Sequence, residues 1–453
     1  MIQHNTHFIG IGGIGMSGLA RILLSHGHSV SGSDICANSV TEELKKMGAT
    51  IHLGHHKDFI PHYSRVIFNS DINQANVEYQ EAVQNNLPLL HRSELLAEML
   101  KDFDSLAVTG THGKTTTSSL LAAILIEGGL DPSFSVGGIL ANYQTNARGG
   151  KGNHFVFEAD ESDGSFLQYH PFGAIVTNID EDHLVNFQGS RKCLEEAFFK
   201  FISQVKSLDH LFICADDPCL RELNLNAQSY GFHETSDWKI INWKQIGFST
   251  FFDLHYLDKQ YLNIELSLIG VHNILNAAAV FGLAITLGIT EEKCRYTLKT
   301  FKGVERRCEF KGIENGIMVI DDYGHHPTEI QTTLQGIRKA IDKQRMIVVY
   351  QPHRYTRTVE CMGKYHSVFD DADEVILTDI FAAGEEPIPE INSKLIFEEI
   401  KATKEACSFI SRNELTQSIL KKAQSNDVLI TLGAGDITKV GPEVLSILGK
   451  NSL

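Results

Sequence analysis

The sequence predicts an α/β protein made of three consecutive domains, each built on a mainly parallel sheet. The length of 453 residues matches about three domains of ~150 residues each. Short apolar runs alternate with stretches of helical length along most of the chain, the pattern of βαβ units. Glycine-containing loops follow two of these runs and lead straight into helices. With 42% apolar and 21% charged residues, the chain has the composition of a soluble globular protein.

The charge and the cysteine pattern exclude several classes of protein. A formal net charge of −16 argues against a surface for nucleic acid or anionic membrane, because phosphates require clustered lysine and arginine. The eight cysteines form no C-x-x-C pair, which favours reduced cytosolic thiols over disulfides or a zinc site. We find no signal peptide and no apolar run of about 18 residues, so we expect a cytoplasmic protein without a transmembrane helix.

The first predicted strand, at 7–11, meets the motif Gly10-x-Gly12-x-x-Gly15. A helix follows, and the next predicted strand ends at Asp34, whose carboxylate suits a ribose hydroxyl. This is the fingerprint of a nucleotide-binding βαβ unit. Two ligands remain open, a nicotinamide cofactor or the diphosphate of a nucleotide-linked substrate. A glycine turn that only permits close packing of helix on sheet is the alternative.

Two further strands are expected near 65–69 and 87–91. Arg92 and Glu94 come just after the second of them. In open α/β sheets ligands bind at the carboxyl ends of strands, so these side chains belong to the predicted binding edge. The first domain is predicted to span 1–103.

Residues 106–117, LAVTGTHGKTTT, predict a phosphate-binding loop. An apolar strand is followed by a glycine-containing loop, and Lys114 and Thr115 open an apolar helix. Backbone N–H groups at such a helix N-terminus face an anion. Lys114 is expected to reach the outer phosphates of a nucleotide and Thr115 to bind Mg²⁺. Val108 stands where the Walker pattern has its first glycine, so this loop is a shorter variant; the alternative is an ordinary strand–helix turn.

Acidic groups follow the next two predicted strands of this domain. The strand at 155–157 ends in Glu158, and the strand at 174–178 leads to an acidic run that ends in His183. A carboxylate at a strand end faces the phosphate loop and is a usual ligand of Mg²⁺. A solvated acidic turn and a surface histidine are the respective alternatives.

The end of the middle domain has a different pattern. Residues 235–268 alternate polar and apolar positions, which predicts antiparallel strands inserted into the helix-and-strand pattern. His272, Asn273 and Asn276 stand at the start of the following helix. They could hold an adenine or ribose, or simply cap the helix. Residues 301–304 are the predicted hinge to the last domain.

The last domain is predicted to be a second doubly wound sheet. Arg354 and Arg357 are three residues apart, and either could bind a carboxylate or phosphate with two hydrogen bonds. Polar clusters come after each of four predicted strands and would share one sheet edge. These strands are 317–320, 346–350, 374–378 and 428–432.

Taken together, these motifs resemble the Mur ligases, ATP-dependent enzymes of bacterial peptidoglycan assembly, over essentially the whole chain. The short phosphate loop is the normal form in that family. The motifs that carry the resemblance are GIGGIGMSGLA at 10–20, TGTHGKTTT at 109–117, EADESDGSF at 158–166, TNIDEDH at 177–183, GVHNILNA at 270–277, DDYGHHPTE at 321–329 and QPHRYTR at 351–357.

The resemblance implies a Rossmann-like UDP-sugar domain at 1–103, a central P-loop ATPase-like domain at 104–302, and a Rossmann-like amino-acid domain at 303–453. It implies that an amino acid is joined to the carboxylate of UDP-N-acetylmuramate through an acyl phosphate, with ATP and Mg²⁺, in a cytoplasmic monomer or weak homodimer. No lysine lies within 177–183, which fits the branch of the family that adds L-alanine.

The resemblance also implies roles for individual residues. The ATP contacts would be Gly110, Thr111, His112, Gly113, Lys114, Thr115, Thr116, His272, Asn273 and Asn276, and the metal ligands Thr115, Glu158 and His183. The UDP-sugar would meet Gly12, Gly13, Ile14, Gly15, Ser70, His91 and Arg92, and the amino acid and acyl phosphate Tyr323, His325, Arg354 and Arg357. The catalytic set would be Lys114, Glu158, His183, His325 and Arg354, with His325 as the base that keeps the attacking amine neutral.

Three alternatives to alanine ligation remain at this point. A recycling ligase that adds a preformed tripeptide to the same UDP-sugar shares the ATP loop and the DD-x-x-HHPT type of motif, although GIGGIGMSG and QPHRYTR favour the alanine enzyme. A nicotinamide oxidoreductase would explain only the first fingerprint. A non-catalytic sensor of nucleotide sugars is the third.

Overall fold

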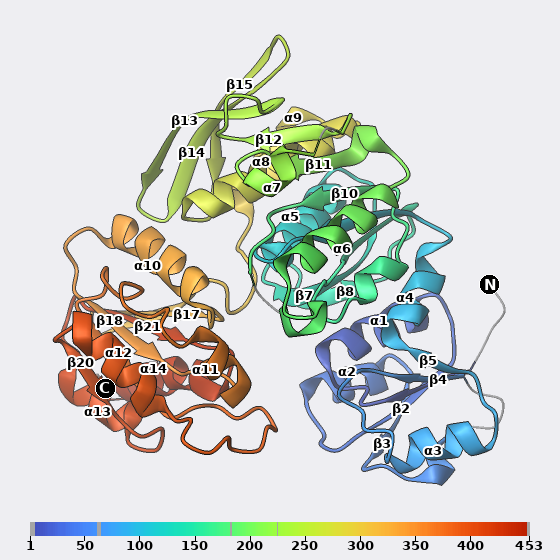
Figure 1. The fold of residues 1–453 in the computed structure, drawn as a ribbon, viewed down its shortest axis with the longest axis horizontal. Coiled ribbons are helices and arrows are strands. Elements are labelled where there is room, and N and C mark those ends of the chain that lie inside the picture. The colour runs from blue at the N-terminus through green and yellow to red at the C-terminus, as the bar shows by residue number, and fades with distance from the viewer. Residues whose placement is uncertain (1–4, 61–64, 182–183, 224, 451–453) are drawn as a thin grey trace. The chain divides into compact units, whose positions relative to one another are not determined.

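The computed structural model describes residues 5–60, 65–181, 184–223 and 225–450 (Figure 1). Three sheets organise this part of the chain. Its backbone contacts divide it into two compact units, and the boundary after the middle domain falls between Phe301 and Lys302. The first unit comprises Met1–Asn242, Asp253–Ile264 and Leu275–Phe301, and the second comprises Trp243–Phe252, Glu265–Ile274 and Lys302–Leu453.

The first sheet is parallel and has the strand order β3-β2-β1-β4-β5. The chain leaves the central strand β1 first in one direction and then, with β4, in the other, which makes the ends of β1 and β4 the topological switch point where ligands bind. The strands are β1 (Thr6–Ile9), β2 (Val30–Asp34), β3 (Thr50–Leu53), β4 (Arg65–Phe68) and β5 (Leu89–His91). The helices are α1 (Ile14–Ser25), α2 (Ser39–Lys46), α3 (Val77–Gln84) and α4 (Arg92–Leu100).

The second sheet has ten strands in the order β15-β14-β13-β12-β11-β10-β6-β9-β7-β8. Its centre, β11-β10-β6-β9, is parallel, so the carboxyl ends of these strands share one edge. The central strands are β6 (Asp104–Thr109), β9 (His154–Glu158), β10 (Gly173–Val176) and β11 (Leu211–Cys214). The outer ones are β7 (Ser133–Leu140), β8 (Thr145–Arg148), β12 (Gln228–Gly231), β13 (Trp238–Ile246), β14 (Ser249–Tyr256) and β15 (Lys259–Leu266).

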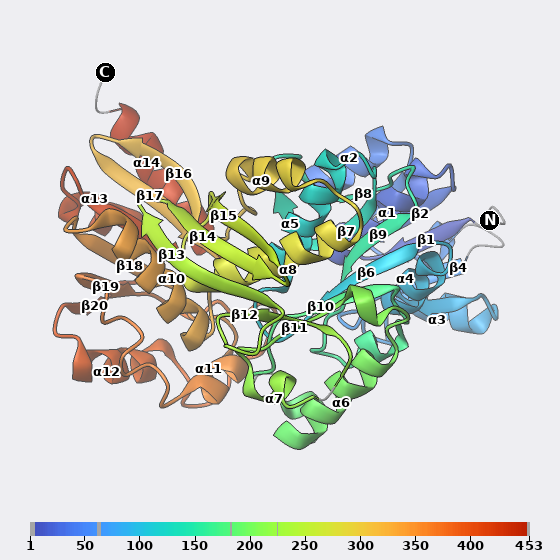
Figure 2. The same cartoon turned by 90° about the horizontal axis from the view of Figure 1, so that it is seen from above.

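Helix α5 packs against this sheet through an almost continuous apolar surface, in which the side chains from Leu120 to Leu125 are fully buried or nearly so. The strands expected within 235–268 are present. They lie side by side and extend the sheet beyond β12 (Figures 1 and 2). The helices of this part are α5 (Lys114–Glu127), α6 (Arg191–Ser203), α7 (Pro218–Arg221), α8 (Val271–Thr286) and α9 (Glu291–Thr300).

The third sheet has the order β16-β17-β21-β18-β19-β20, and only β16 runs antiparallel to its neighbour among these pairs. Separate apolar clusters cover its two faces, one centred on Leu334 and Ile337 of α10 and the other on Ile419 and Val444. The predicted doubly wound sheet is therefore confirmed. The strands are β16 (Glu309–Glu314), β17 (Ile317–Asp322), β18 (Met346–Tyr350), β19 (Glu374–Leu377), β20 (Cys407–Phe409) and β21 (Val428–Leu432). The helices are α10 (Pro327–Ile341), α11 (Tyr355–Cys361), α12 (Ser393–Thr403), α13 (Leu415–Lys422) and α14 (Val440–Lys450).

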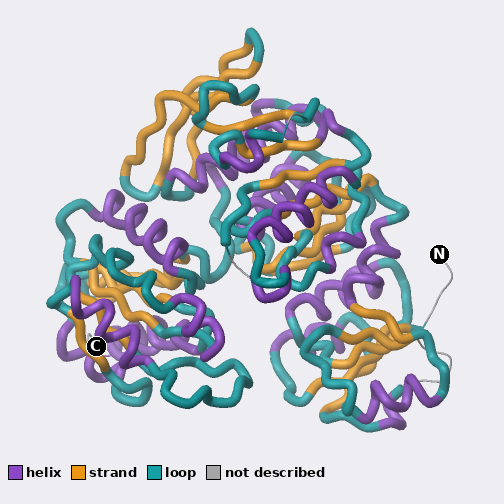
Figure 3. Tube along the Cα trace, in the orientation of Figure 1, coloured by secondary structure: helices purple, strands orange, loops and turns teal. Residues whose placement is uncertain are grey.

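Helices and strands alternate over much of the chain, as the sequence pattern indicated, although β12 to β15 follow one another without a helix (Figure 3). The element boundaries differ from the prediction in a few places. The first strand ends at Ile9 rather than Ile11, because Gly10 adopts φ +78° and turns the chain. Asp321 and Asp322, expected after a strand, are its last two residues. All eight cysteines are free. Within the described ranges no helix has both the length and the apolar character needed to cross a membrane.

Candidate active site

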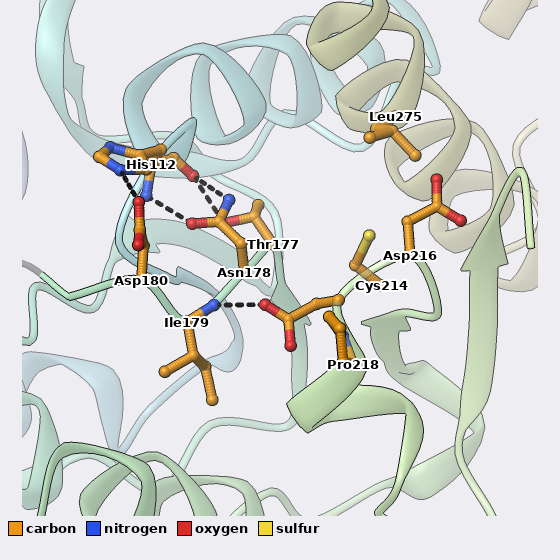
Figure 4. Close-up of a pocket in the computed structure, with 10 residues that line it drawn as sticks. His112, Thr177, Asn178, Ile179, Asp180, Cys214, Asp216, Pro218 and Leu275 are labelled. Atoms are coloured by element: carbon orange, nitrogen blue, oxygen red, sulfur yellow. Dashed lines mark hydrogen bonds and ion pairs between the residues drawn. The ribbon is translucent and has the colours of Figure 1, made fainter. Parts of the chain in front are cut away.

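The loop between β6 and α5 is held in one conformation by the end of β10. Thr111 N donates to the carbonyl of Asn178 (3.0 Å), and His112 N donates to the Asn178 side chain (2.9 Å). The His112 ring lies 3.1 Å from an Asp180 carboxylate oxygen (Figure 4). Gly110 has φ +128°, and a Cβ there would lie 2.1 Å from the Thr177 hydroxyl. Only glycine fits this position, so the loop is organised before any ligand arrives.

The N-terminus of α5 can take an anion. The helix begins at Lys114 and has no acidic residue in its first turn, so its unpaired N–H groups and dipole favour a negative group there. The Lys114 ammonium donates to the carbonyls of Gly110 (2.8 Å) and Thr111 (3.1 Å) and to Glu161 Oε2 (2.7 Å). Burial acts to lower the pKa of Lys114, but the carboxylates of Glu161 and Asp160 outweigh it and raise that pKa, so the lysine is charged.

Glu158, at the end of β9, lies beside the first turn of α5. Its Oε2 accepts a hydrogen bond from the Thr115 hydroxyl (3.2 Å). Its Oε1 accepts from the Ser118 hydroxyl (2.9 Å) and from Gly137 N (2.6 Å). A hydroxyl and a carboxylate placed side by side are the oxygen ligands that Mg²⁺ prefers. The sequence reasoning missed Ser118 and Gly137, since neither lies in a recognised motif.

Burial raises the pKa of Glu158, and a bound cation would favour its ionised form. The third predicted metal ligand, His183, lies outside the described residues. Within the ranges that are described, no group of three or more histidine, cysteine, aspartate or glutamate side chains could hold a metal ion. The residues present fit a Mg²⁺ site that includes one hydroxyl and one carboxylate.

A pocket of about 350 Å³ opens beside the phosphate loop (Figure 4). It lies between the ends of β10 and β11, and Leu275 of α8 lines it as well. Asp217 accepts a hydrogen bond from Ile179 N (2.8 Å), which ties the two strand ends together. The polar lining includes His112, Asn178, Asp180, Asp216 and Asp217.

The three polar residues at the start of α8 differ in their surroundings. Asn276 approaches the phosphate loop: a Cβ on Gly113 would lie 3.0 Å from its Oδ1. The Asn273 side chain donates to the carbonyl of Ile269 (2.8 Å), a contact of the helix start. Burial lowers the pKa of His272 to about 4, so its imidazole is neutral at pH 7.

The residues predicted to face a UDP-sugar gather at the switch point of the first sheet. The Ser70 hydroxyl lies 3.2 Å from His91 Nε2. The Arg92 guanidinium covers the glycine turn, since a Cβ on Gly15 would meet its Nη1 at 3.0 Å. Both oxygens of Asp34, predicted to bind a ribose, already accept hydrogen bonds, from Gly12 N (2.8 Å) and from Cys36 N (3.3 Å). Gly13 and Ile14 follow, and Ile14 is half exposed.

A second cluster lies at the carboxyl edge of the third sheet. The rings of Tyr323 and His325 are 5.4 Å apart, and His353 lies 5.8 Å from His325. The guanidinium groups of Arg306 and Arg307 lie over the Tyr323 ring, at 4.9 and 5.2 Å from its centre. Sequence reasoning missed these two arginines, because they precede Tyr323 by 17 and 16 positions and only the fold brings them to the tyrosine.

The backbone of Arg354 is strained. Its φ is +63°, a region that non-glycine residues rarely adopt and that is concentrated at functional sites. Arg354 N donates to the carbonyl of Phe381 (2.8 Å), and a β-bridge joins His353 to Phe381. The strand-end contact therefore holds the arginine in this conformation. Arg357 lies close enough to His325 to lower the pKa of that histidine.

His325 is in the neutral state that a general base requires, but its low pKa gives it little tendency to take up a proton. Its Nδ1–H donates a hydrogen bond to the carbonyl of Tyr323 (3.1 Å), which leaves the lone pair on Nε2. Burial is the main cause that lowers the pKa of His325, to about 4. The imidazole is thus neutral at pH 7, yet a general base works best with a pKa near the operating pH.

Three family models match consecutive parts of the chain. The model "Mur ligase family, catalytic domain" matches 5–104, "Mur ligase middle domain" matches 108–284, and "Mur ligase, glutamate ligase domain" matches 306–435. The chain belongs to the Mur ligase family. The resemblance inferred from the motifs is thereby confirmed.

Individual relatives agree with this membership. The chain is 54% identical over 448 residues to a UDP-N-acetylmuramate–L-alanine ligase of Protochlamydia amoebophila, covering 99% of both chains. A crystal structure of the UDP-N-acetylmuramate-alanine ligase of Thermotoga maritima superposes with a TM-score of 0.86 at 29% identity, again over 99% of both chains. A murein peptide ligase of Psychrobacter arcticus has a TM-score of 0.70 at 23% identity over 98% and 99% of the chains, and shares the fold.

Proposed function

We propose that this Mur ligase uses ATP to join L-alanine to the carboxylate of UDP-N-acetylmuramate, a step of cytoplasmic peptidoglycan precursor synthesis. The observation that carries the proposal is the geometry at the start of α5. Lys114 and Thr115 stand at a helix N-terminus, and Glu158 lies 3.2 Å from the Thr115 hydroxyl. Full-length identity of 54% to a relative of that name supports the choice of substrates.

Each domain has a proposed ligand. The UDP-sugar binds to 1–103, ATP to 104–302 and the amino acid to 303–453. The UDP-sugar diphosphate lies on the glycine turn at Gly12–Gly15, beneath Arg92, with Ser70 and His91 next to it. The nucleoside of ATP occupies the pocket beside His112 and Leu275. Alanine and the acyl phosphate contact Tyr323, His325, Arg354 and Arg357.

The reaction begins with attack of the muramic carboxylate on the γ-phosphate of ATP. Lys114 and the backbone N–H groups at the start of α5 stabilise the charge on the transferred phosphoryl group. Thr115, Glu158 and His183 would hold a Mg²⁺ ion, which would supply further charge neutralisation there. ADP leaves, and the sugar acid remains as an acyl phosphate.

The alanine amine then attacks the acyl carbon. The C–N bond forms, phosphate leaves with the electrons of the C–O bond, and the amine gives up a proton. His325 accepts this proton through Nε2. The two arginines Arg354 and Arg357 hold the alanine carboxylate and the acyl phosphate. Excluding water during this step protects the acyl phosphate from hydrolysis.

An assay with competing amines tests the proposal. The purified protein is incubated with ATP, Mg²⁺, UDP-N-acetylmuramate and equal amounts of alanine, glycine, serine and a preformed tripeptide, and the products are identified by mass spectrometry. We expect the alanine amide together with one phosphate per amide, and no phosphate when any one substrate is omitted. Turnover of the tripeptide but not alanine would instead identify a recycling ligase. The partners proposed are small molecules, for a monomer or weak homodimer.

A further inference from the structure

The Lys114 ammonium has no proton left for a nucleotide. Its three N–H groups donate to the carbonyl of Gly110, the carbonyl of Thr111 and Glu161 Oε2. The contact with Glu161, at 2.7 Å, is the shortest of the three, and Glu161 is the one carboxylate among these acceptors. The carboxylate of Asp160 lies further from the lysine, at 3.8 Å. A phosphate oxygen can therefore bond to this lysine only by replacing one of these acceptors.

Glu161 is the acceptor that a phosphate can displace. The two carbonyls belong to the loop itself, and hydrogen bonds to the end of β10 fix that loop. Glu161 instead lies 47 residues further along the chain, on the turn after β9. Of the three acceptors only Glu161 can carry a negative charge, so it is also the strongest competitor for the lysine.

We propose that Glu161 is a positioning residue that holds Lys114 back in the nucleotide-free enzyme and competes with the phosphates of ATP for it. The proposal rests on the proposed function, in which Lys114 binds those phosphates. The contribution of Lys114 to the free energy of nucleotide binding is then a difference between two ion pairs: the one that it forms with the ATP phosphates and the one with Glu161 that it must give up.

The surroundings of Glu161 fit an exchangeable partner. Its side chain is 2% exposed, and its Oε1 has no hydrogen-bond partner among the described residues. A carboxylate built only for stability would have both oxygens satisfied. Burial raises the pKa of Glu161 to about 7 although Lys114 lowers it, so the ion pair with the lysine only partly offsets the cost of burying this charge.

Calorimetric titration with a non-hydrolysable ATP analogue, AMP-PNP, in the presence of Mg²⁺ tests the proposal. Glu161→Gln keeps the shape of the side chain and removes its charge. We expect this variant to bind AMP-PNP about tenfold more tightly than the wild type, which corresponds to one ion pair of about 1.4 kcal/mol. Adenosine, which has no phosphate, should bind equally to both. Asp163→Asn is the matched control, because it removes an exposed carboxylate from the same turn and should change neither affinity.

A double-mutant cycle decides whether the effect acts through the lysine. In the Lys114→Ala background, Glu161→Gln should leave AMP-PNP affinity unchanged. If the glutamine variant is poorly folded, Glu161→Asp withdraws the carboxylate by one methylene and should also tighten binding. Equal or weaker AMP-PNP binding in folded variants overturns the inference and leaves the proposed function intact. No AMP-PNP binding by the wild type overturns both.

Discussion

Two buried glutamates of the first unit have opposite environments. Glu78, in α3, is completely buried, and its Oε2 lies 3.1 Å from His7 Nε2 and 2.7 Å from the Ser33 hydroxyl. Its Oε1 accepts from His56 N at 3.1 Å. Burial acts to raise the pKa of Glu78, but the hydrogen bonds from His7 and Ser33 outweigh it and lower that pKa. Glu161 is buried almost as deeply, keeps one oxygen unpartnered among the described residues, and has its pKa raised.

If the proposal holds, the difference separates a carboxylate that stabilises the fold from one that takes part in nucleotide binding. The partners of Glu78 come from two strands and a loop, and all its hydrogen bonds are made in the folded chain alone. The partner of Glu161 is Lys114, which we propose also binds the phosphates of ATP. A fully satisfied buried network stabilises one conformation, whereas a partly satisfied one stores a cost that a ligand can relieve.

The largest predicted effect is that of Lys114→Ala on turnover. Removing a charged donor from the transferred phosphoryl group should lower kcat by about 10³-fold. Glu161 then lacks its counter-charge, and its raised pKa lets it take up a proton instead, so the fold should survive. Initial rates of phosphate release and the thermal melting temperature measure the two effects. A rate within tenfold of wild type would remove Lys114 from the mechanism.

For Glu78→Ala we predict the reverse of Lys114→Ala, a large loss of stability with little change in kcat. The variant leaves His7 and Ser33 buried without this acceptor, and breaking a buried pair in this way costs about 3–5 kcal/mol. Urea unfolding should show this loss, while kcat per folded molecule should remain near that of the wild type. A stable Glu78→Ala protein with a large loss of kcat would show that this glutamate belongs to the active site.

Sequence reasoning found the parts of the site that follow a strand end. Lys114, Thr115 and Glu158 lie where the parallel pattern placed them, because the carboxyl ends of β6 and β9 share one edge. Arg92 was found for the same reason, whereas Ser70 and His91 were proposed from the family resemblance. The fold class needed only the alternation of apolar runs and helical stretches. Residue roles and domain limits remain predictions.

Contacts between distant segments could not be read from the pattern. Glu161 was visible only as one acid in an acidic run, and its pairing with Lys114 depends on how the turn after β9 folds. Arg306 and Arg307 reach Tyr323 through an antiparallel edge strand that the sequence did not reveal. Gly137 carries no side chain, so its N–H contact with Glu158 left no signal in the sequence.

Gly137→Ala should have an intermediate effect, which is confined to the dependence of the rate on Mg²⁺. A Cβ there would lie 2.8 Å from Glu158 Oε2 and 2.9 Å from the Thr115 hydroxyl, which forces the two predicted ligands apart. We expect the Mg²⁺ concentration needed for half-maximal rate to rise about tenfold, the lower end of what supporting contacts of metal ligands contribute. Ser118→Ala, which removes one hydrogen bond without adding an atom, should shift it less. An unchanged Mg²⁺ dependence in both variants would argue against metal binding by Glu158.

The smallest predicted effect is on the pH dependence of stability, which should have opposite signs for Glu78 and Glu161. The pKa of Glu78 is below its ordinary value of 4.5 in the folded chain. Its contribution to the free energy of unfolding is therefore present above pH 4.5 and is lost as the pH falls through the folded pKa. The stability difference between wild type and Glu78→Gln should shrink in acid.

Glu161 should behave in the opposite way. Its pKa is raised from 4.5 to about 7, so its contribution is complete below pH 4.5 and is lost as the pH rises through about 7. Melting temperatures of Glu161→Gln and the wild type, measured without nucleotide between pH 5 and 8.5, should therefore shift in favour of the variant as the pH rises. A parallel response of the two glutamine variants would mean that Glu78 and Glu161 have the same structural role, because only a carboxylate with an incomplete set of partners loses stability on ionisation.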